Sequence, residues 1–322
     1  MHMVGVLTRL TLRIAGASLL VAGALLHAQQ AALTSSEAAG NALRAAEPEF
    51  GTTSPGMPSA AMDAPVPPQT SSSIAGQLHP ELEVLTNVLN QHRRAGNRDA
   101  EAGTLCALGN SYNALGQRQK AIEQFKLALA IYRELGDRKG MANALSLIGD
   151  GYRGWGFPEQ AVDSYRSALE NFARTDDKTG TEVALNNLGV AYISLGDKKK
   201  SLEYLKRALN AYRDGGDRRA MALTLINIGA VENFLGHDPG KALGMLQEAA
   251  TELDALNDHR DEADAFELMG AVWTGLHKQE LAESNFQRAL AFYREVGDAK
   301  GEASVLRHMR DLGRREDFAS AR

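Results

Sequence analysis

Few residues in this chain stand at spacings that could support catalysis. The eight histidines include no pair four residues apart with a glutamate between them, so the helical zinc-hydrolase pattern is absent. The single cysteine, Cys106, lies among apolar and small residues, where a packed thiol without activation is expected. No serine stands in a Gly-x-Ser-x-Gly elbow. The sequence therefore predicts no catalytic residue, no metal site and no cofactor, and we do not expect an enzyme.

One segment, Gly236 to Ala242, partly imitates a phosphate-binding loop. Such a loop needs four residues between its glycines and a hydroxyl residue after its lysine, and this segment meets neither requirement. We expect Pro239 to open a helix instead, because proline suits the first helical position. His277 takes the place of a usual turn glycine and is expected to be a surface turn residue.

The elements that must carry any site follow from a repeat of 40 residues. A glycine recurs in register along the last two thirds of the chain, and an alanine recurs about 20 residues after each glycine. The glycines are Gly109, Gly149, Gly189, Gly229 and Gly270, and the alanines are Ala128, Ala168, Ala208, Ala249 and Ala289. Units of this size bury their apolar faces only against their neighbours, so the pattern predicts a solenoid.

Each repeat is predicted to be a pair of helices. In the first repeat, apolar residues at spacings of three and four run from Leu105 to Leu115 and again from Ala121 to Leu135. Gly116 separates the two stretches, and Gly136 with Asp137 ends the second, as expected of a left-handed helix end followed by a helix-capping carboxylate.

The pattern Leu-x-x-Leu-Gly-x-x-Tyr followed by Ala-x-x-x-Phe-x-x-Ala-Leu, within 105–129, resembles the tetratricopeptide (TPR) repeat. The repeat length and the Leu-Gly-Asp-Arg-Lys-Gly junction at 135–140 are similar to the longer variant of LGN/Pins-type, kinesin-light-chain and bacterial TPR proteins. The resemblance implies an all-α fold, a right-handed α-solenoid of antiparallel helix pairs. We expect this solenoid over 80–322, with a half repeat at 81–100, five full repeats at 101–300 and a capping helix at 301–322.

The first 79 residues are of a different kind. Arg9 and Arg13 precede an apolar run of 13 residues, Ile14 to Leu26, which predicts a secretory signal peptide at 1–28 with cleavage after Ala28. An uncleaved membrane anchor is the alternative. Residues 29–79 are rich in proline, serine and alanine and are predicted to be a disordered linker, with a proline-rich docking motif as the minor alternative. We expect an exported protein, in the bacterial periplasm or outside the cell, or anchored in the inner membrane if the signal stays uncleaved.

The TPR resemblance also implies where a ligand binds. In that family the first helix of each pair lines a concave groove, and its amides hold the main chain of an extended peptide. The polar residues expected in this groove are Asn110, Asn143, Asp150, Asn186, Asn187 and Asn227, together with Arg153, one turn from Asp150, and Asp264 and Glu267 fall at matching positions of the fifth repeat. Asp150 and Arg153 are expected to add selectivity for charge. The alternative is that the asparagine amides bond between neighbouring helices.

The charge composition limits the kinds of partner that we expect. The formal net charge is −5, and acidic and basic residues are interspersed, so no basic face for nucleic acid is expected. We expect a non-enzymatic adaptor or scaffold that binds a peptide segment or helix of a partner protein, with no small-molecule substrate and with membrane contact only through an uncleaved amino-terminal segment. The alternatives are a self-associating envelope component and a regulatory subunit of a catalytic or signalling partner.

Overall fold

The computed structural model describes residues 72–320, with side chains within 81–313. These residues form twelve α-helices and no strand, which confirms the predicted all-α class. The helices are α2 (Ser72–Ala95), α3 (Arg98–Ala114), α4 (Arg118–Leu135), α5 (Arg138–Trp155), α6 (Pro158–Arg174), α7 (Lys178–Ser194), α8 (Lys198–Gly215), α9 (Arg218–Phe234), α10 (Pro239–Ala255), α11 (His259–Gly275), α12 (Gln279–Glu295) and α13 (Ala299–Ser320).

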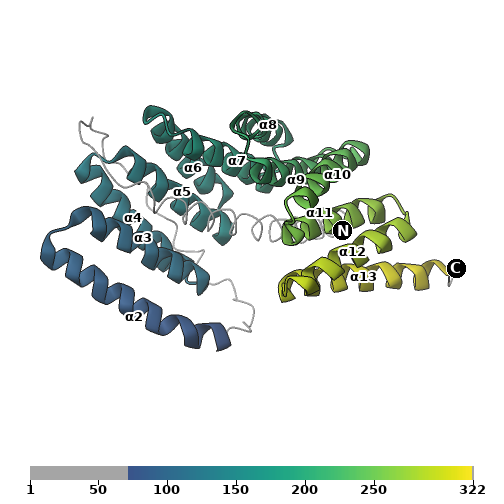
Figure 1. Cartoon of the computed structure of the whole chain (residues 1–322), viewed down its shortest axis with the longest axis horizontal. Helices are drawn as coiled ribbons and strands as arrows, with labels where there is room; N and C mark the ends of the chain where they lie inside the picture. Colours follow the sequence, from purple (N-terminus) through teal and green to yellow (C-terminus); the bar gives the residue numbers. More distant parts are fainter. Residues whose placement is uncertain (1–71, 321–322) are drawn as a thin grey trace, which may run out of the picture. The chain divides into compact units, whose positions relative to one another are not determined.

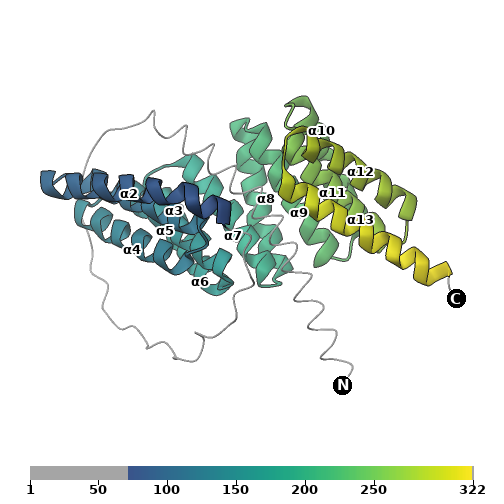
Figure 2. The same cartoon turned by 90° about the horizontal axis from the view of Figure 1, so that it is seen from below.

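The described residues divide into two compact units between Gly180 and Thr181. The N-terminal unit holds α2 to α6 and the start of α7, and the C-terminal unit holds the rest of α7 and α8 to α13. Within the N-terminal unit each helix from α2 to α6 packs against the next, and the same holds from α8 to α13 in the C-terminal unit (Figures 1 and 2). We call α3, α5, α7, α9, α11 and α13 the first helices, and α4, α6, α8, α10 and α12 the second helices.

The recurring glycine brings the two helices of a pair into close contact. A Cβ atom on Gly149 of α5 would lie 2.6 Å from Cε1 of Tyr165 on α6, and one on Gly229 of α9 would lie 2.9 Å from Cγ of Leu246 on α10. The other three glycines face Phe125, Leu205 and Phe286 in the same way. All five large side chains are almost fully buried. The missing side chain on one helix therefore makes room for a large one on its partner.

The predicted junction chemistry is confirmed at most helix ends. Gly136 takes a left-handed φ of 67° after α4, and the Asp137 side chain accepts a hydrogen bond from the amide of Gly140 at 2.9 Å. An aspartate caps α8, α9, α10 and α11 in the same manner. Pro239 opens α10, and the exposed His277 takes a φ of 57° after α11. These ends fix where each helix starts, and so which residues share a face.

The amino-terminal expectations lie mostly outside the described residues, which begin at residue 72. One boundary is corrected. Helix α2 begins at Ser72, so residues 72–79 are helical and not part of the linker predicted at 29–79. The apolar spacing of Leu82 and Leu85 extends back along the sequence to Leu78 and Ile74, which accounts for the earlier start.

Candidate functional site

The predicted site residues are distributed over both units. Asn110, on α3, is half-buried, and Asn143, on α5, is exposed. Asp150 and Arg153 also lie on α5, whereas Asn186, Asn187 and Asn227 lie on α7 and α9 in the C-terminal unit. Only part of the predicted set is therefore held together by contacts within one unit.

Asn186 and Asn227 form a pair between two first helices. The Nδ2 of Asn227 donates to Oδ1 of Asn186 at 3.3 Å, and the Thr224 hydroxyl approaches the same oxygen at 3.4 Å. Both asparagines are buried, with 8% and 6% of their surface exposed. The amides thus bond between neighbouring helices, as the alternative interpretation of the sequence expected. Both bonds are long compared with the usual distance of about 2.9 Å, so they are weak.

Asn187 is different, because its amide has no hydrogen-bond partner among the described residues. The residue is 1% exposed, and neither its Nδ2 nor its Oδ1 has a hydrogen-bond partner in the part of the chain that the structure describes. A buried amide left in this way costs about 1–3 kcal/mol for each unsatisfied group. Such a group in a folded protein calls for a water molecule or a ligand.

Asp150 and Arg153 are engaged with the second helix of their own pair. The Tyr165 hydroxyl of α6 donates to Oδ1 of Asp150 at 2.5 Å, and Nε of Arg153 donates to the Tyr165 oxygen at 3.3 Å. Burial and the charge of Asp150 raise the pKa of Tyr165 well above its ordinary value. Burial alone would lower the pKa of Arg153, but Tyr165 and Asp150 outweigh it and keep the guanidinium charged. Both predicted charges thus contribute to the contact between α5 and α6.

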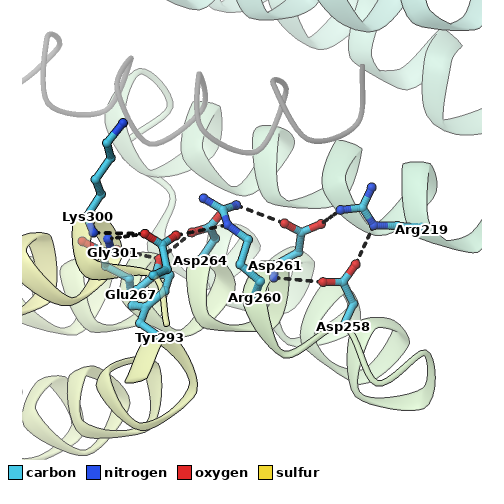
Figure 3. A network of polar contacts seen from close by, with 10 residues as sticks. Arg219, Asp258, Arg260, Asp261, Asp264, Glu267, Tyr293, Lys300 and Gly301 are labelled. Atoms are coloured by element: carbon cyan, nitrogen blue, oxygen red, sulfur yellow. Dashed lines mark hydrogen bonds and ion pairs between the residues drawn. The ribbon is translucent and has the colours of Figure 1, made fainter. Parts of the chain in front are cut away.

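A second polar cluster, which the sequence did not single out as a network, surrounds α11 (Figure 3). Its five carboxyl groups belong to Asp258, Asp261, Asp264, Glu267 and Asp298, and its two guanidinium groups to Arg219 and Arg260. Arg219 reaches from α9, donating to Asp258 at 2.5 Å and also to the fully buried Asp261. Burial raises the pKa of Asp261, although Arg219 opposes this.

Arg260 connects this cluster along α11. Its Nη1 atom lies 3.2 Å from Asp261 and 3.1 Å from Asp264, and its Nε donates to Asp298 at 3.2 Å. Burial raises the pKa of Asp264 to about 7, because Arg260 offsets only part of the lost hydration. Two guanidinium groups therefore do not neutralise the carboxyl groups around them.

Glu267 links the cluster to α12 and α13. Its side chain is fully buried, and it accepts hydrogen bonds from the Tyr293 hydroxyl at 3.0 Å and from the Ser304 hydroxyl at 2.7 Å. The Nδ1 atom of His308 lies 3.2 Å from the same carboxyl group. The sequence placed Asp264 and Glu267 on one face but gave no sign of these partners on α12 and α13.

The pair on α7 and α9 and the cluster on α11 are built alike, although Ser304 stands one position before Val305, the equivalent of Thr224. In each, one first helix supplies an acceptor, and the next first helix supplies a hydroxyl and a nitrogen. The acceptors are Asn186 and Glu267, the hydroxyl groups are Thr224 and Ser304, and the nitrogens are those of Asn227 and His308. Polar residues at these positions therefore join successive helix pairs within the C-terminal unit.

The single thiol, that of Cys106, lies on α3 and packs against the apolar core of the N-terminal unit. Burial raises the pKa of Cys106 to about 12, so its thiol is not activated. In the described part of the chain, no three His, Cys, Asp or Glu side chains are arranged so that they could hold a metal ion. Between residues 72 and 320, no helix has the length and apolar character needed to cross a membrane.

Helix pairs of similar length, packed in succession and separated by capped turns, define a helical repeat protein. The tetratricopeptide repeat family matches the sequence at residues 100–174, 140–214 and 181–251. Residues 100–251 are thus tetratricopeptide repeats. No curated protein sequence matches it.

Several solved structures share the fold. BtubC (BKLC) from P. vanneervenii superposes with a TM-score of 0.61 at 20% identity, covering 68% of this chain and 92% of that chain. Aspartyl phosphate phosphatase F from Bacillus subtilis gives 0.58 at 17% identity, covering 67% and 57%. The Rap conjugation gene regulator of the plasmid pLS20, solved with the Phr* peptide, gives 0.56 at 16% identity, covering 66% and 59%. At these identities the likeness concerns the fold alone.

Proposed function

We propose that this protein is a non-enzymatic adaptor that binds a peptide segment or helix of a partner protein along its first helices. The observation that carries the proposal is the buried amide of Asn187, whose donor and acceptor both lack a partner among the described residues. A peptide main chain offers both an N–H donor and a C=O acceptor, so it matches both groups of such an amide. Because Asn187 is only 1% exposed, we propose that its side chain turns outward when the peptide binds.

The neighbouring pair, Asn186 and Asn227, supports the same assignment. Their mutual bond of 3.3 Å is weak, so exchanging it for a shorter bond to a peptide group carries little cost. Contacts to main-chain atoms hold an extended segment without requiring a particular sequence. Asn110 and Asn143 extend the predicted amide set to α3 and α5. Asp150 and Arg153 are assigned a supporting role, because Tyr165 engages both.

The solved structures of this fold agree with a binding role. The Rap conjugation gene regulator was solved in complex with the Phr* peptide, so a chain of this architecture can hold a peptide. We further propose that the helix pairs of this protein continue as a right-handed superhelix whose inner face is the binding face. The chain then acts through what it binds, and no residue in it performs chemistry.

A crosslinking experiment on the full chain tests the binding face. A photoreactive phenylalanine analogue replaces the exposed Asn143 of α5, and in a separate protein it replaces the exposed Asn210 of α8, a second helix. We expect a peptide library, and then cell-envelope extract, to give specific crosslinks from position 143 and not from position 210. Equal crosslinking from both positions would show that the first helices hold no preferred ligand.

A matched pair of variants then tests the amides. In one, Asn186, Asn187 and Asn227 become alanine, and in the other, Asn171, Asn210 and Asn285 on second helices become alanine. Each hydrogen bond between an amide and the peptide is expected to contribute about 0.5–1.5 kcal/mol to binding. Its loss should therefore weaken binding of the crosslinked peptide by about 3- to 10-fold. The control is expected to bind as the parent does. Undiminished binding by the first variant, with an unchanged circular dichroism spectrum, refutes the role of the amides.

We also propose that the protein is exported, on the strength of the signal-like sequence Arg9 to Ala28. Fractionation of producing cells, with the mass of the mature chain, tests this. Export with cleavage after Ala28 gives a periplasmic or secreted protein that starts at Gln29. A full-length chain in the cytosol contradicts the proposal, whereas a full-length chain in the membrane fraction supports the uncleaved anchor.

A further inference from the structure

One tyrosine hydroxyl in the C-terminal unit lies between two carboxyl groups. The Oη atom of Tyr293 is hydrogen-bonded to Oδ1 of Asp264 and lies 3.0 Å from Oε2 of Glu267. A phenol has one proton to donate, so it can satisfy only one of two ionised carboxylates. Burial and the two nearby carboxyl groups raise the pKa of Tyr293, so the hydroxyl keeps its proton. The second contact then needs a proton that belongs to one of the carboxyl groups.

Few other groups face this trio. On α11 itself, Arg260 pairs with Asp264 at 3.1 Å, and Asp261 lies beyond it. From α13, Ser304 donates to Glu267, and the ring nitrogen of His308 lies 3.2 Å away, where it is an ion-pair partner only when protonated.

The other packed helices place their charges farther along α11. Arg219 of α9 binds Asp258 and Asp261, and Asp254 of α10 acts on Glu262. Asp298, before α13, is bound to Arg260 and to the amides of Lys300 and Gly301. No described cation other than Arg260 and His308 is therefore in contact with the Asp264, Tyr293 and Glu267 trio.

We propose that Asp264, Tyr293 and Glu267 share one bound proton, which holds α12 and α13 against α11, and that its release as the pH rises loosens these two helices. With the proton in place, the three oxygen-bearing groups form a continuous chain of hydrogen bonds. Without it, two carboxylates face one hydroxyl inside the protein, and they repel each other. The proton leaves to solvent, and Glu267 keeps its contact with Ser304. This inference concerns the C-terminal unit alone and does not depend on the proposed ligand.

The direction of the pH effect follows from the raised pKa of Asp264, about 7 against an ordinary value of 3.8. The folded state holds the proton more tightly than the opened state does. The proton therefore stabilises the fold fully only at pH values below the ordinary pKa of aspartate, 3.8. That contribution is lost as the pH rises toward the folded value, and it does not change further above it.

Hydrogen exchange on the full chain tests the proposal at the helices concerned. After correction for intrinsic exchange rates, we expect protection of peptides within 279–313 to fall by up to about tenfold per pH unit between about pH 5 and 7 and then to level off. In Asp264→Asn the amide stays neutral, so this pH dependence is expected to disappear. Asp214→Asn, which removes an exposed carboxyl group on α8, should leave it unchanged. The same pH dependence in all three proteins would overturn the proposal.

A direct titration keeps the proposal testable even if Asp264→Asn fails to fold. Carbon-13 labelling of the aspartate carboxyl groups in the full chain reports each titration by NMR. One aspartate is expected to titrate near pH 7. This titration should move to higher pH in Tyr293→Phe, which keeps the ring but removes the hydroxyl that stabilises the ionised form of Asp264. If every aspartate titrates below about pH 5 in the parent protein, no proton is held there near neutrality and the proposal fails.

Discussion

Replacing Gly270 by alanine tests whether the recurring glycine sets the distance between paired helices. Gly270 lies on α11, and a Cβ atom there would stand 2.5 Å from Cε1 and 2.6 Å from Cδ1 of Phe286 on α12. Phe286 is 1% exposed, so its ring has nowhere to move without displacing other core residues. Overpacking of this kind costs about 1–3 kcal/mol.

Alanine also favours a helix over glycine by about 1 kcal/mol, which opposes the steric cost. The matched control, Gly244→Ala on α10, isolates the steric part, because a Cβ there meets nothing within 4 Å. Both variants gain the same helix propensity within one unit of the protein. We therefore expect Gly270→Ala to be about 1–3 kcal/mol less stable than Gly244→Ala, and Gly244→Ala to be more stable than the parent.

Urea denaturation followed by circular dichroism measures the two free energies, and hydrogen exchange locates the change. We expect the loss of protection in Gly270→Ala to be concentrated in α11 and α12, since each repeat contacts mainly its neighbours. If the two variants differ by less than about 0.5 kcal/mol, the glycine is not needed for close approach and the account of pair packing is wrong.

Three further outcomes follow from individual contacts. The thiol of Cys106, with its pKa raised to about 12, should react with a thiol reagent at pH 8 at least about 100-fold more slowly in the folded protein than in denaturant, and equal rates would contradict its burial. Asp217→Ala removes the cap of α9 and should cost about 1 kcal/mol in a urea titration, whereas the exposed Asp214→Ala should change stability by less than about 0.5 kcal/mol. Tyr165→Phe removes the hydrogen bond that Asp150 accepts from the Tyr165 hydroxyl and should cost about 1–3 kcal/mol, and an unchanged thermal midpoint would refute that contribution.

The helix pairs could be predicted from the sequence because their determinants are local. The spacing between Gly149 and Tyr165 is short, and both residues recur in register, so their contact follows from the repeat itself. The caps follow in the same way, since Asp137 and the amide it binds are three residues apart. The start of α2 at Ser72 was missed because a proline- and serine-rich composition outweighed the apolar spacing there.

Contacts between successive pairs were harder to predict. Whether Asn186 meets Asn227 depends on how one pair is staggered against the next, and the period alone does not give that offset. The contacts of Glu267 were missed for the same reason, because its partners Ser304 and His308 belong to α13, the first helix after its own pair. One signal was present in the sequence. Only the fifth repeat has acidic residues, Asp264 and Glu267, at two of the positions that the resemblance assigns to the groove.

The polar contacts between first helices determine which repeat can follow which. If the fourth repeat were removed, α11 would become the next first helix after α7. Leu268 and Ala265 of α11 would then face Asn186, because they occupy the repeat positions of Asn227 and Thr224. Neither side chain can donate a hydrogen bond to Oδ1 of Asn186. Units that look interchangeable by length are thus ordered by their neighbours, and shuffling them should yield arrays that assemble less well than the native succession.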